Sequence, residues 1–296
     1  MRRFITFALA AAWLVSSAGF APTSARATVQ SDPQKTDKKD EKKDETPQTP
    51  VAPPKTSKEP TAEQVAELVI YVYGSRERIE QIQRNSIERG RVTRSLDEGR
   101  TEEVTYERRQ VRGGTSEKDK IRLDQKTPTM EYSLLYTDGR VWGIINGTPF
   151  TPRQETVAPF LANTQRGLNA LLRYKEDGST LAYVGKEKQK NIEMWVLDVF
   201  DKEKRRTRFY ISTQKWRILW LEYEETPSAG AKPVQFKRTF HDYRYAQGQL
   251  VAYRSVFYVD GKQAEETNVL NVTFGTKMDD SIFKTADATA ATTSEP

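Results

Sequence analysis

The chain has 296 residues with a formal net charge of +6, one histidine and no cysteine. This length allows one large domain or two small ones, and the lack of cysteine excludes a disulfide scaffold and thiol catalysis. Three of the positive charges, on Arg2, Arg3 and Arg26, belong to the N-terminal segment described next. The remaining +3 is too small to indicate a nucleic-acid partner.

The N-terminus has the pattern of a bacterial secretion signal. Two arginines precede a long apolar run, and the small-x-small sequence Ala25-Arg26-Ala27 follows it. We expect residues 1–27 to be a cleaved signal peptide that directs the protein to the periplasm or outside the cell. An uncleaved membrane anchor is the alternative. No cysteine follows the run, so the mature chain cannot be a lipidated lipoprotein.

Residues 28–60 have the composition of a disordered linker. They contain six prolines, seven lysines, seven acidic residues and no aromatic residue. Such a segment buries too little apolar surface to offset its chain entropy. We therefore expect a charged, Pro-rich tether here, a folded domain over residues 61–284, and a disordered polar tail over residues 285–296.

Two segments of the domain have the periodicity of helices. Apolar residues recur at helical spacing from Val65 to Ile82, after Thr61 and Gln64 at capping-box spacing. The second segment, residues 151–174, has Thr151 as a possible N-cap, Pro152 at the first helical position and Gln154 as the capping partner. Pro159 is expected to kink or delay this helix.

The rest of the domain alternates with period two between turn signals. Strands are predicted near residues 86–96, 101–112, 118–126, 129–137 and 140–146, and again near 179–188, 191–200, 204–212, 216–225, 233–245, 249–259 and 263–274. Two-residue hairpin turns are predicted at Asp138-Gly139, Asn146-Gly147 and Asp260-Gly261. The predicted fold class is therefore α+β: one large curved antiparallel sheet, an incomplete β-barrel of about 11–12 strands, with helices on its concave face.

The sequence contains little that resembles an active site. The single histidine, His241, lies in a predicted strand, and no nucleophile elbow, zinc motif or phosphate loop is present. We therefore predict a protein that is not an enzyme and that uses neither a metal nor a cofactor. The basic run from Lys202 to Arg208 fits either a charged strand edge or a patch for an anionic membrane surface.

Large apolar side chains are concentrated on the second predicted helix and on the strands. Between residues 192 and 200 both phases of the strand are apolar, which fits a covered core or a sheet that lines a cavity. The candidates for lining a ligand cavity come from this helix and from these strands: Val157, Phe160, Leu161, Leu168, Leu171, Trp142, Trp195, Phe209, Trp216, Trp220 and Phe236.

The order of these segments resembles the LolA-like family of bacterial outer-membrane lipoprotein-sorting and carrier proteins. The similarity covers residues 62–284: a helix, five strands, a helix and about seven strands, closing with the strand pair 249–274 and the segment Asp279-Asp280-Ser281-Ile282-Phe283. It implies an incomplete barrel with a helical lid and a hydrophobic cavity that shields acyl chains of a lipoprotein or other amphiphile.

The resemblance also implies an arginine that handles the ligand or its headgroup. Arg89, Arg91 and Arg94 all lie in the corresponding early strand, and the choice among them is open. The implied partners are acyl chains and an inner- or outer-membrane lipoprotein-handling protein. The long tether differs from compact carriers, so the alternative is an envelope sensor or regulatory domain on the same fold that contacts a membrane protein.

Overall fold

The computed structural model describes residues 59–226 and 230–284. The predicted signal peptide, nearly all of the predicted linker, and the predicted tail lie outside these residues. The strands are β1 Asn85–Ser95, β2 Thr101–Val111, β3 Lys120–Lys126, β4 Glu131–Thr137, β5 Arg140–Ile145, β6 Thr148–Phe150, β7 Thr180–Gln189, β8 Ile192–Phe200, β9 Arg206–Ser212, β10 Ile218–Glu225, β11 Val234–Ala246, β12 Gln249–Val259 and β13 Lys262–Phe274.

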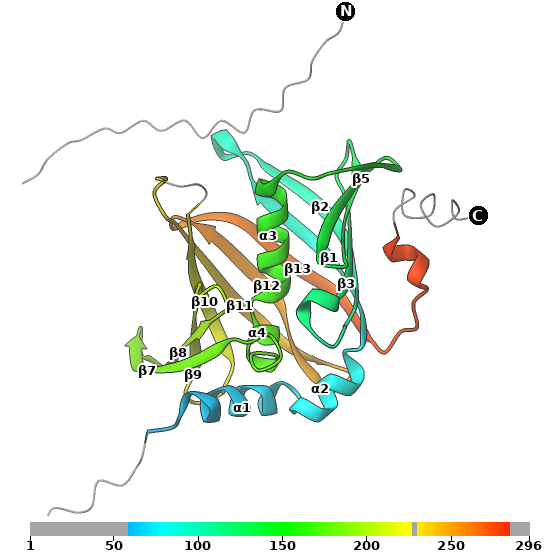
Figure 1. Cartoon of the computed structure of the whole chain (residues 1–296). Helices are drawn as coiled ribbons and strands as arrows, with labels where there is room; N and C mark the ends of the chain where they lie inside the picture. The colour runs from blue at the N-terminus through cyan, green and yellow to red at the C-terminus, as the bar shows by residue number, and fades with distance from the viewer. Residues whose placement is uncertain (1–58, 227–229, 285–296) are drawn as a thin grey trace, which may run out of the picture. The chain divides into compact units, whose positions relative to one another are not determined.

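All thirteen strands form one antiparallel sheet, in the order β6-β5-β4-β3-β2-β1-β13-β12-β11-β10-β9-β8-β7. The two halves of the chain meet where β1 pairs with β13, with Ser86 opposite Phe274 and Arg94 opposite Glu265. The sheet is curved and open, because β6 and β7 are its two edges (Figure 1). This confirms the predicted α+β architecture, an incomplete barrel with helices on its concave side.

The sheet has one strand more than the upper end of the predicted range. The additional strand is β6, which follows the predicted Asn146-Gly147 turn, where both residues have positive φ values of 50° and 83°. This is the backbone conformation that a tight hairpin requires. The returning strand has only three residues and contains Pro149, so it is too short to give an alternating pattern.

The first predicted helix is two helices. α1 covers Ala62–Tyr73 and has the predicted capping box, because the Gln64 amide donates to Thr61 Oγ1 and the Thr61 amide to Gln64 Oε1. α2 covers Arg76–Ile82. Gly74 and Ser75 separate them with φ values of 135° and 65°, which no α-helix accommodates. The apolar stripe passes across this turn, so the sequence periodicity did not reveal the break.

The second predicted helix is also interrupted. It consists of α3, Gln154–Gln165, and α4, Leu168–Leu172. The predicted cap is wrong: Arg153 is the N-cap and makes no side-chain capping bond, and Thr151 and Pro152 precede the helix. Pro159 lies inside α3 without ending it. The chain instead breaks at Gly167, where φ is 101°. Three short 3₁₀ turns, Asp97–Gly99, Ser116–Lys118 and Asp280–Phe283, complete the elements.

Helices cover the two flanks of the concave face. Under α1 and α4 lies the main core, which includes Val69, Leu171, Leu197, Phe209 and Ile211. On the other flank Phe160 of α3 packs with Ile121, Leu134 and Tyr136 from β3 and β4. In Figure 1 α3 and α4 lie inside the curve of the sheet. The middle strands between these clusters are where the cavity described below is found.

The double apolarity of β8 has a simple explanation. Leu197 and Val199 enter the main core, whereas Met194 and Val196 form a separate cluster with Tyr210, Leu219 and Trp220. Successive strand residues point to opposite faces, so this second cluster lies on the other side of the sheet.

In residues 59–226 and 230–284 no helix is both long and apolar enough to span a membrane.

Candidate functional site

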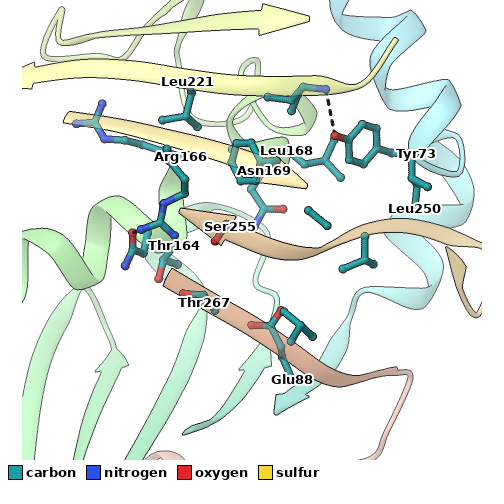
Figure 2. A pocket seen from close by; sticks show the side chains of 18 of the residues that line it. Tyr73, Glu88, Thr164, Arg166, Leu168, Asn169, Leu221, Leu250, Ser255 and Thr267 are labelled. Atoms are coloured by element: carbon teal, nitrogen blue, oxygen red, sulfur yellow. Dashed lines mark hydrogen bonds between the residues drawn. The ribbon is translucent and has the colours of Figure 1, made fainter. Parts of the chain in front are cut away.

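A cavity of about 250 Å³ lies between the α3–α4 break and the middle of the sheet (Figure 2). Residues 162–169 form its helical side, and the opposite wall comes from β1, β2 and β10 to β13. These strands include both the β1–β13 junction and the long β11–β12 hairpin. The cavity therefore exists only because distant parts of the chain are brought together by the sheet.

One part of the cavity wall is apolar. It is formed by Leu168 of α4, Ile218 and Leu221 of β10, Phe240 of β11 and Leu250 of β12. Ile218, Leu221 and Leu250 are also members of the main core, so this wall is continuous with packed side chains behind it. A wall of this kind can hold a hydrocarbon group, because burying apolar surface is favourable without directional contacts.

A tyrosine network closes the cavity beside α1. The Ile218 amide donates to Tyr73 Oη over 3.2 Å, shown by the dashed line in Figure 2. Tyr73 Oη in turn donates to Tyr243 Oη over 2.9 Å, and Tyr243 donates to the Ile218 carbonyl. Burial raises the pKa of Tyr73 to about 12. Both hydroxyls therefore stay neutral and hold α1 against β10 and β11.

Charged side chains occupy another part of the wall. Arg108 of β2, Arg238 of β11 and Glu88 of β1 all line the cavity. Tyr106 Oη donates to Glu88 Oε1 over 2.8 Å, and Arg108 Nη2 donates to Gln110 Oε1 over 3.1 Å. Burial, together with the nearby Glu88 carboxylate, raises the pKa of Tyr106, so its hydroxyl remains a donor.

Arg238 has an unusual environment for an arginine. Its guanidinium donates to Asn163 Oδ1 of α3 and lies over the Phe257 ring, 5.0 Å from the ring centre. Burial lowers the pKa of Arg238; Tyr223 and the Glu265 carboxylate oppose this shift, and the charge on Arg108 adds to it. Within the described ranges, no carboxylate lies within 4.0 Å of the charged nitrogens of Arg108 or Arg238.

Arg166 fastens the helix break to the sheet. It lies between α3 and Gly167, and its guanidinium stacks 3.8 Å from the centre of the Tyr223 ring. Its Nη2 donates to Glu225 Oε1 over 2.8 Å, and its Nη1 donates to Thr207 Oγ1. Unlike Arg108 and Arg238, Arg166 therefore has a carboxylate that balances its charge.

The structure places the sequence-derived cavity candidates in different environments. Leu168 lines the cavity. Leu171 and Phe209 are fully buried in the main core, and Trp195, Trp216 and Phe236 pack against it. Phe160 and Leu161 belong to the cluster on the β3–β4 flank, Trp220 stacks on Tyr210 on the opposite face of the sheet, and Val157 and Trp142 are partly buried.

The three candidate arginines of β1 lie outside the cavity wall. Arg89 and Arg91 are exposed and face Glu107 and Glu103. Arg94 is half-buried but already satisfied: Nε donates to Glu265 Oε1 over 3.1 Å and Nη2 to Tyr132 Oη over 3.1 Å. Sequence reasoning missed Arg108 and Arg238. One pattern could have revealed Arg238, because it shares its strand phase with Phe236 and Phe240.

The remaining chemistry of the described residues is sparse. Residues 59–226 and 230–284 contain no group of three or more His, Cys, Asp or Glu side chains that could hold a metal ion. His241 is exposed on β11, where Nε2 is 2.8 Å from Thr239 Oγ1. The site that the structure does offer is a binding cavity with an apolar wall and a cationic wall.

No protein-family model and no curated protein matches the chain. Solved structures do. A DUF1329 family protein from Desulfovibrio piger superposes with a TM-score of 0.57 at 11% identity, covering 77% of this chain and 98% of the other. A LolA superfamily protein from Nitrosomonas europaea has a TM-score of 0.53 at 10% identity, and the match covers 76% of this chain and 98% of the other. A putative outer-membrane lipoprotein-sorting protein domain from Vibrio parahaemolyticus has a TM-score of 0.52 at 11% identity, and the match covers 75% of this chain and 96% of the other.

Proposed function

Because the chain has a LolA-like fold, we propose that it is an exported carrier that holds an acyl chain of a lipoprotein or another amphiphile. The observation that carries this proposal is the cavity between the α3–α4 break and the sheet. The carrier works by sequestering its ligand from water, and no bond is made or broken.

The energy for carriage comes from the apolar wall. Each buried methylene contributes about 0.8 kcal/mol, so even a short stretch of acyl chain against Leu168, Leu221 and Leu250 gives useful affinity. At about 250 Å³ the cavity is slightly below the ~300–1,000 Å³ of typical small-molecule sites. A complete lipoprotein anchor therefore needs the cavity to widen.

The interrupted helix is the element that can move. α4 is anchored by a buried ion pair, in which Arg173 Nη1 donates to both carboxylate oxygens of Asp119 over 2.9 Å. The C-terminal end of α3 is held to the strands by Arg166 and by the Arg238–Asn163 hydrogen bond. Gly167 lies between the two helices in a conformation that favours glycine. Opening would rotate α3 about Gly167 and leave α4 in place.

The proposed location is the periplasm of a bacterium. It is supported by the apolar, arginine-initiated N-terminus with Ala25-Arg26-Ala27, and by the lipoprotein-sorting name of a structural neighbour. Osmotic-shock fractionation of cells that express the full chain tests it. A mature N-terminus close to Thr28 in the shock fluid is the expected result, and retention of Met1 in the membrane fraction would contradict cleavage.

Lipid analysis tests carriage directly. The protein is purified without detergent, extracted with organic solvent and analysed by mass spectrometry, and a displaceable apolar fluorophore then measures binding. We expect co-purified acyl lipid and displacement by added fatty acid. A lipid-free protein that binds no fluorophore would refute the proposal.

A matched pair of variants links binding to the cavity. Thr267 lines the cavity, whereas Thr273, on the same strand, hydrogen-bonds to exposed Asn271. Thr267→Trp should fill the cavity and weaken fluorophore binding at least about tenfold, since it displaces several methylenes. Thr273→Trp should bind as the unmodified protein does. Equal binding by both variants would place the ligand elsewhere.

The sensor alternative has a different signature. If the domain contacts a membrane protein, a pull-down from envelope extracts should recover that protein whether or not the cavity is filled. If Thr267→Trp retained such a partner and no acyl lipid was ever found, the regulatory function would be favoured over carriage.

A further inference from the structure

Two arginines in the cavity form no ion pair within 4.0 Å among the described residues. Arg108 and Arg238 line the same space, yet within the described ranges each makes its hydrogen bond to a neutral amide, Gln110 for Arg108 and Asn163 for Arg238. Two neighbouring arginines differ in this respect, because Arg166 is paired with Glu225 and Arg94 with Glu265.

The charge balance of the wall is positive. Three arginines, Arg108, Arg166 and Arg238, face one glutamate, Glu88, so the lining carries an excess of two positive charges. Glu225, which is outside the lining, balances the charge of Arg166. Arg108 and Arg238 then carry one positive charge more than Glu88 compensates. Placing uncompensated charge beside apolar groups is costly unless a partner arrives.

A buried polar atom in the same cavity also lacks a partner. Gln249, at the start of β12, is only 4% exposed, and its Oε1 accepts no hydrogen bond. Buried polar groups are nearly always hydrogen-bonded, so this oxygen is free to accept a hydrogen bond from a ligand or a water in the cavity. The cavity is thus built to accept polar atoms in addition to hydrocarbon.

From this geometry we infer that the ligand is a single-chain amphiphile with an anionic head, a carboxylate or a phosphate, which Arg108 and Arg238 bind while the chain lies against Phe240, Leu221 and Leu250. This inference rests on the proposed carrier function and specifies its substrate class. Guanidinium groups suit such heads because their planar N–H groups match carboxylate and phosphate oxygens. The small volume favours one chain over several.

Ligands with the same chain and different heads test the inference. Tetradecanoate, tetradecyl phosphate and tetradecanol are titrated against the protein–fluorophore complex at pH 8, below their micelle concentrations, and inorganic phosphate is titrated separately. Hydrogen bonds to a charged partner contribute about 1.5–3 kcal/mol, so the two anions should bind roughly 10–100-fold more tightly than the alcohol. Inorganic phosphate should not compete at millimolar concentration.

Variants assign the preference to the two arginines. Arg108→Gln with Arg238→Gln should reduce the preference for the anions over tetradecanol to under about threefold. Arg108→Lys with Arg238→Lys should retain a preference for anions, because both charges are kept. Arg89→Gln is the matched control, since Arg89 is exposed and outside the cavity wall.

The outcomes separate this inference from the carrier proposal. Equal binding of anion and alcohol would overturn the anionic head and leave carriage standing, as would a preference that survives in the double glutamine variant. Failure of all three amphiphiles to bind would overturn both. Tight binding of inorganic phosphate that displaces tetradecanoate would show a free anion site and overturn the amphiphile. If the glutamine variant fails to fold, loss of preference in the lysine variant overturns the inference.

Discussion

The anchoring of α4 by Arg173 gives the sharpest stability prediction. Arg173 is one of the largest fully buried side chains, and Asp119 is only 4% exposed. Besides Asp119, Arg173 reaches Glu176 through Nε over 3.0 Å and the Gly113 carbonyl through Nη2 over 3.2 Å. Arg173→Ala removes all of these donors and leaves the Asp119 carboxylate buried without its cationic partner.

Removing one partner of a buried ion pair costs about 3–5 kcal/mol. That is a large share of the ~5–15 kcal/mol that stabilises a typical domain. At ~2–4 °C per kcal/mol for a domain of this size, Arg173→Ala should lower the Tm by about 6–20 °C. The assay is urea denaturation followed by tryptophan fluorescence, with thermal unfolding in parallel.

Two further variants show whether the buried charge is responsible. Arg173→Met combined with Asp119→Leu replaces both charges by apolar groups and should recover most of the lost stability. Arg205→Ala removes an exposed ion pair with Asp201 and should cost under about 1 kcal/mol. A loss of less than 1 kcal/mol in Arg173→Ala would refute the anchoring role, as would a double variant less stable than the single one.

Three other changes test separate parts of the account. Arg166→Gln breaks the ion pair with Glu225 and should speed fluorophore release from the cavity, measured by stopped flow. Gly90→Ala places a Cβ 2.5 Å from the Asn268 carbonyl oxygen, so it should cost about 1–3 kcal/mol of unfolding free energy in urea. Thr61→Ala removes the α1 cap and should cost about 1 kcal/mol in the same assay.

Each of these changes has a matched comparison. Gly114→Ala meets no atom within 4 Å and should leave stability nearly unchanged, so equal losses at Gly90 and Gly114 would refute the close-contact argument. Thr61→Ser keeps the capping oxygen and should retain the stability that alanine loses. Arg140→Gln, at an exposed position on β5, should not alter fluorophore release; if Arg166→Gln behaves the same way, α3 is not held by Arg166.

The sheet could be predicted from sequence because its pattern is local. Alternating strands and two-residue turns such as Asp260-Gly261 place the hairpins within a few residues of their observed positions. The helix breaks were missed because Gly74 and Gly167 interrupt stripes whose apolar spacing continues across them. A single glycine costs a helix only about 1 kcal/mol, so its presence did not predict a break.

The cavity could not be predicted in the same way. Its wall depends on which strand phase faces inward and on the pairing of β1 with β13, which joins residues far apart in sequence. Of the large aromatic residues, Phe209 is buried in the main core and Trp195 packs against it, and neither lines the cavity. The charged residues of the cavity wall, Arg108 and Arg238, look in sequence like ordinary surface charges.

Native mass spectrometry shows whether the cavity holds an acyl chain, using the mature protein purified without detergent and then mixed with tetradecanoate. We expect one acyl ligand to bind per chain, and we expect Thr267→Trp to abolish the bound species while Thr273→Trp retains it. A protein that never acquires the added mass, or acquires it equally in both variants, would contradict a carrier whose ligand lies beneath α3.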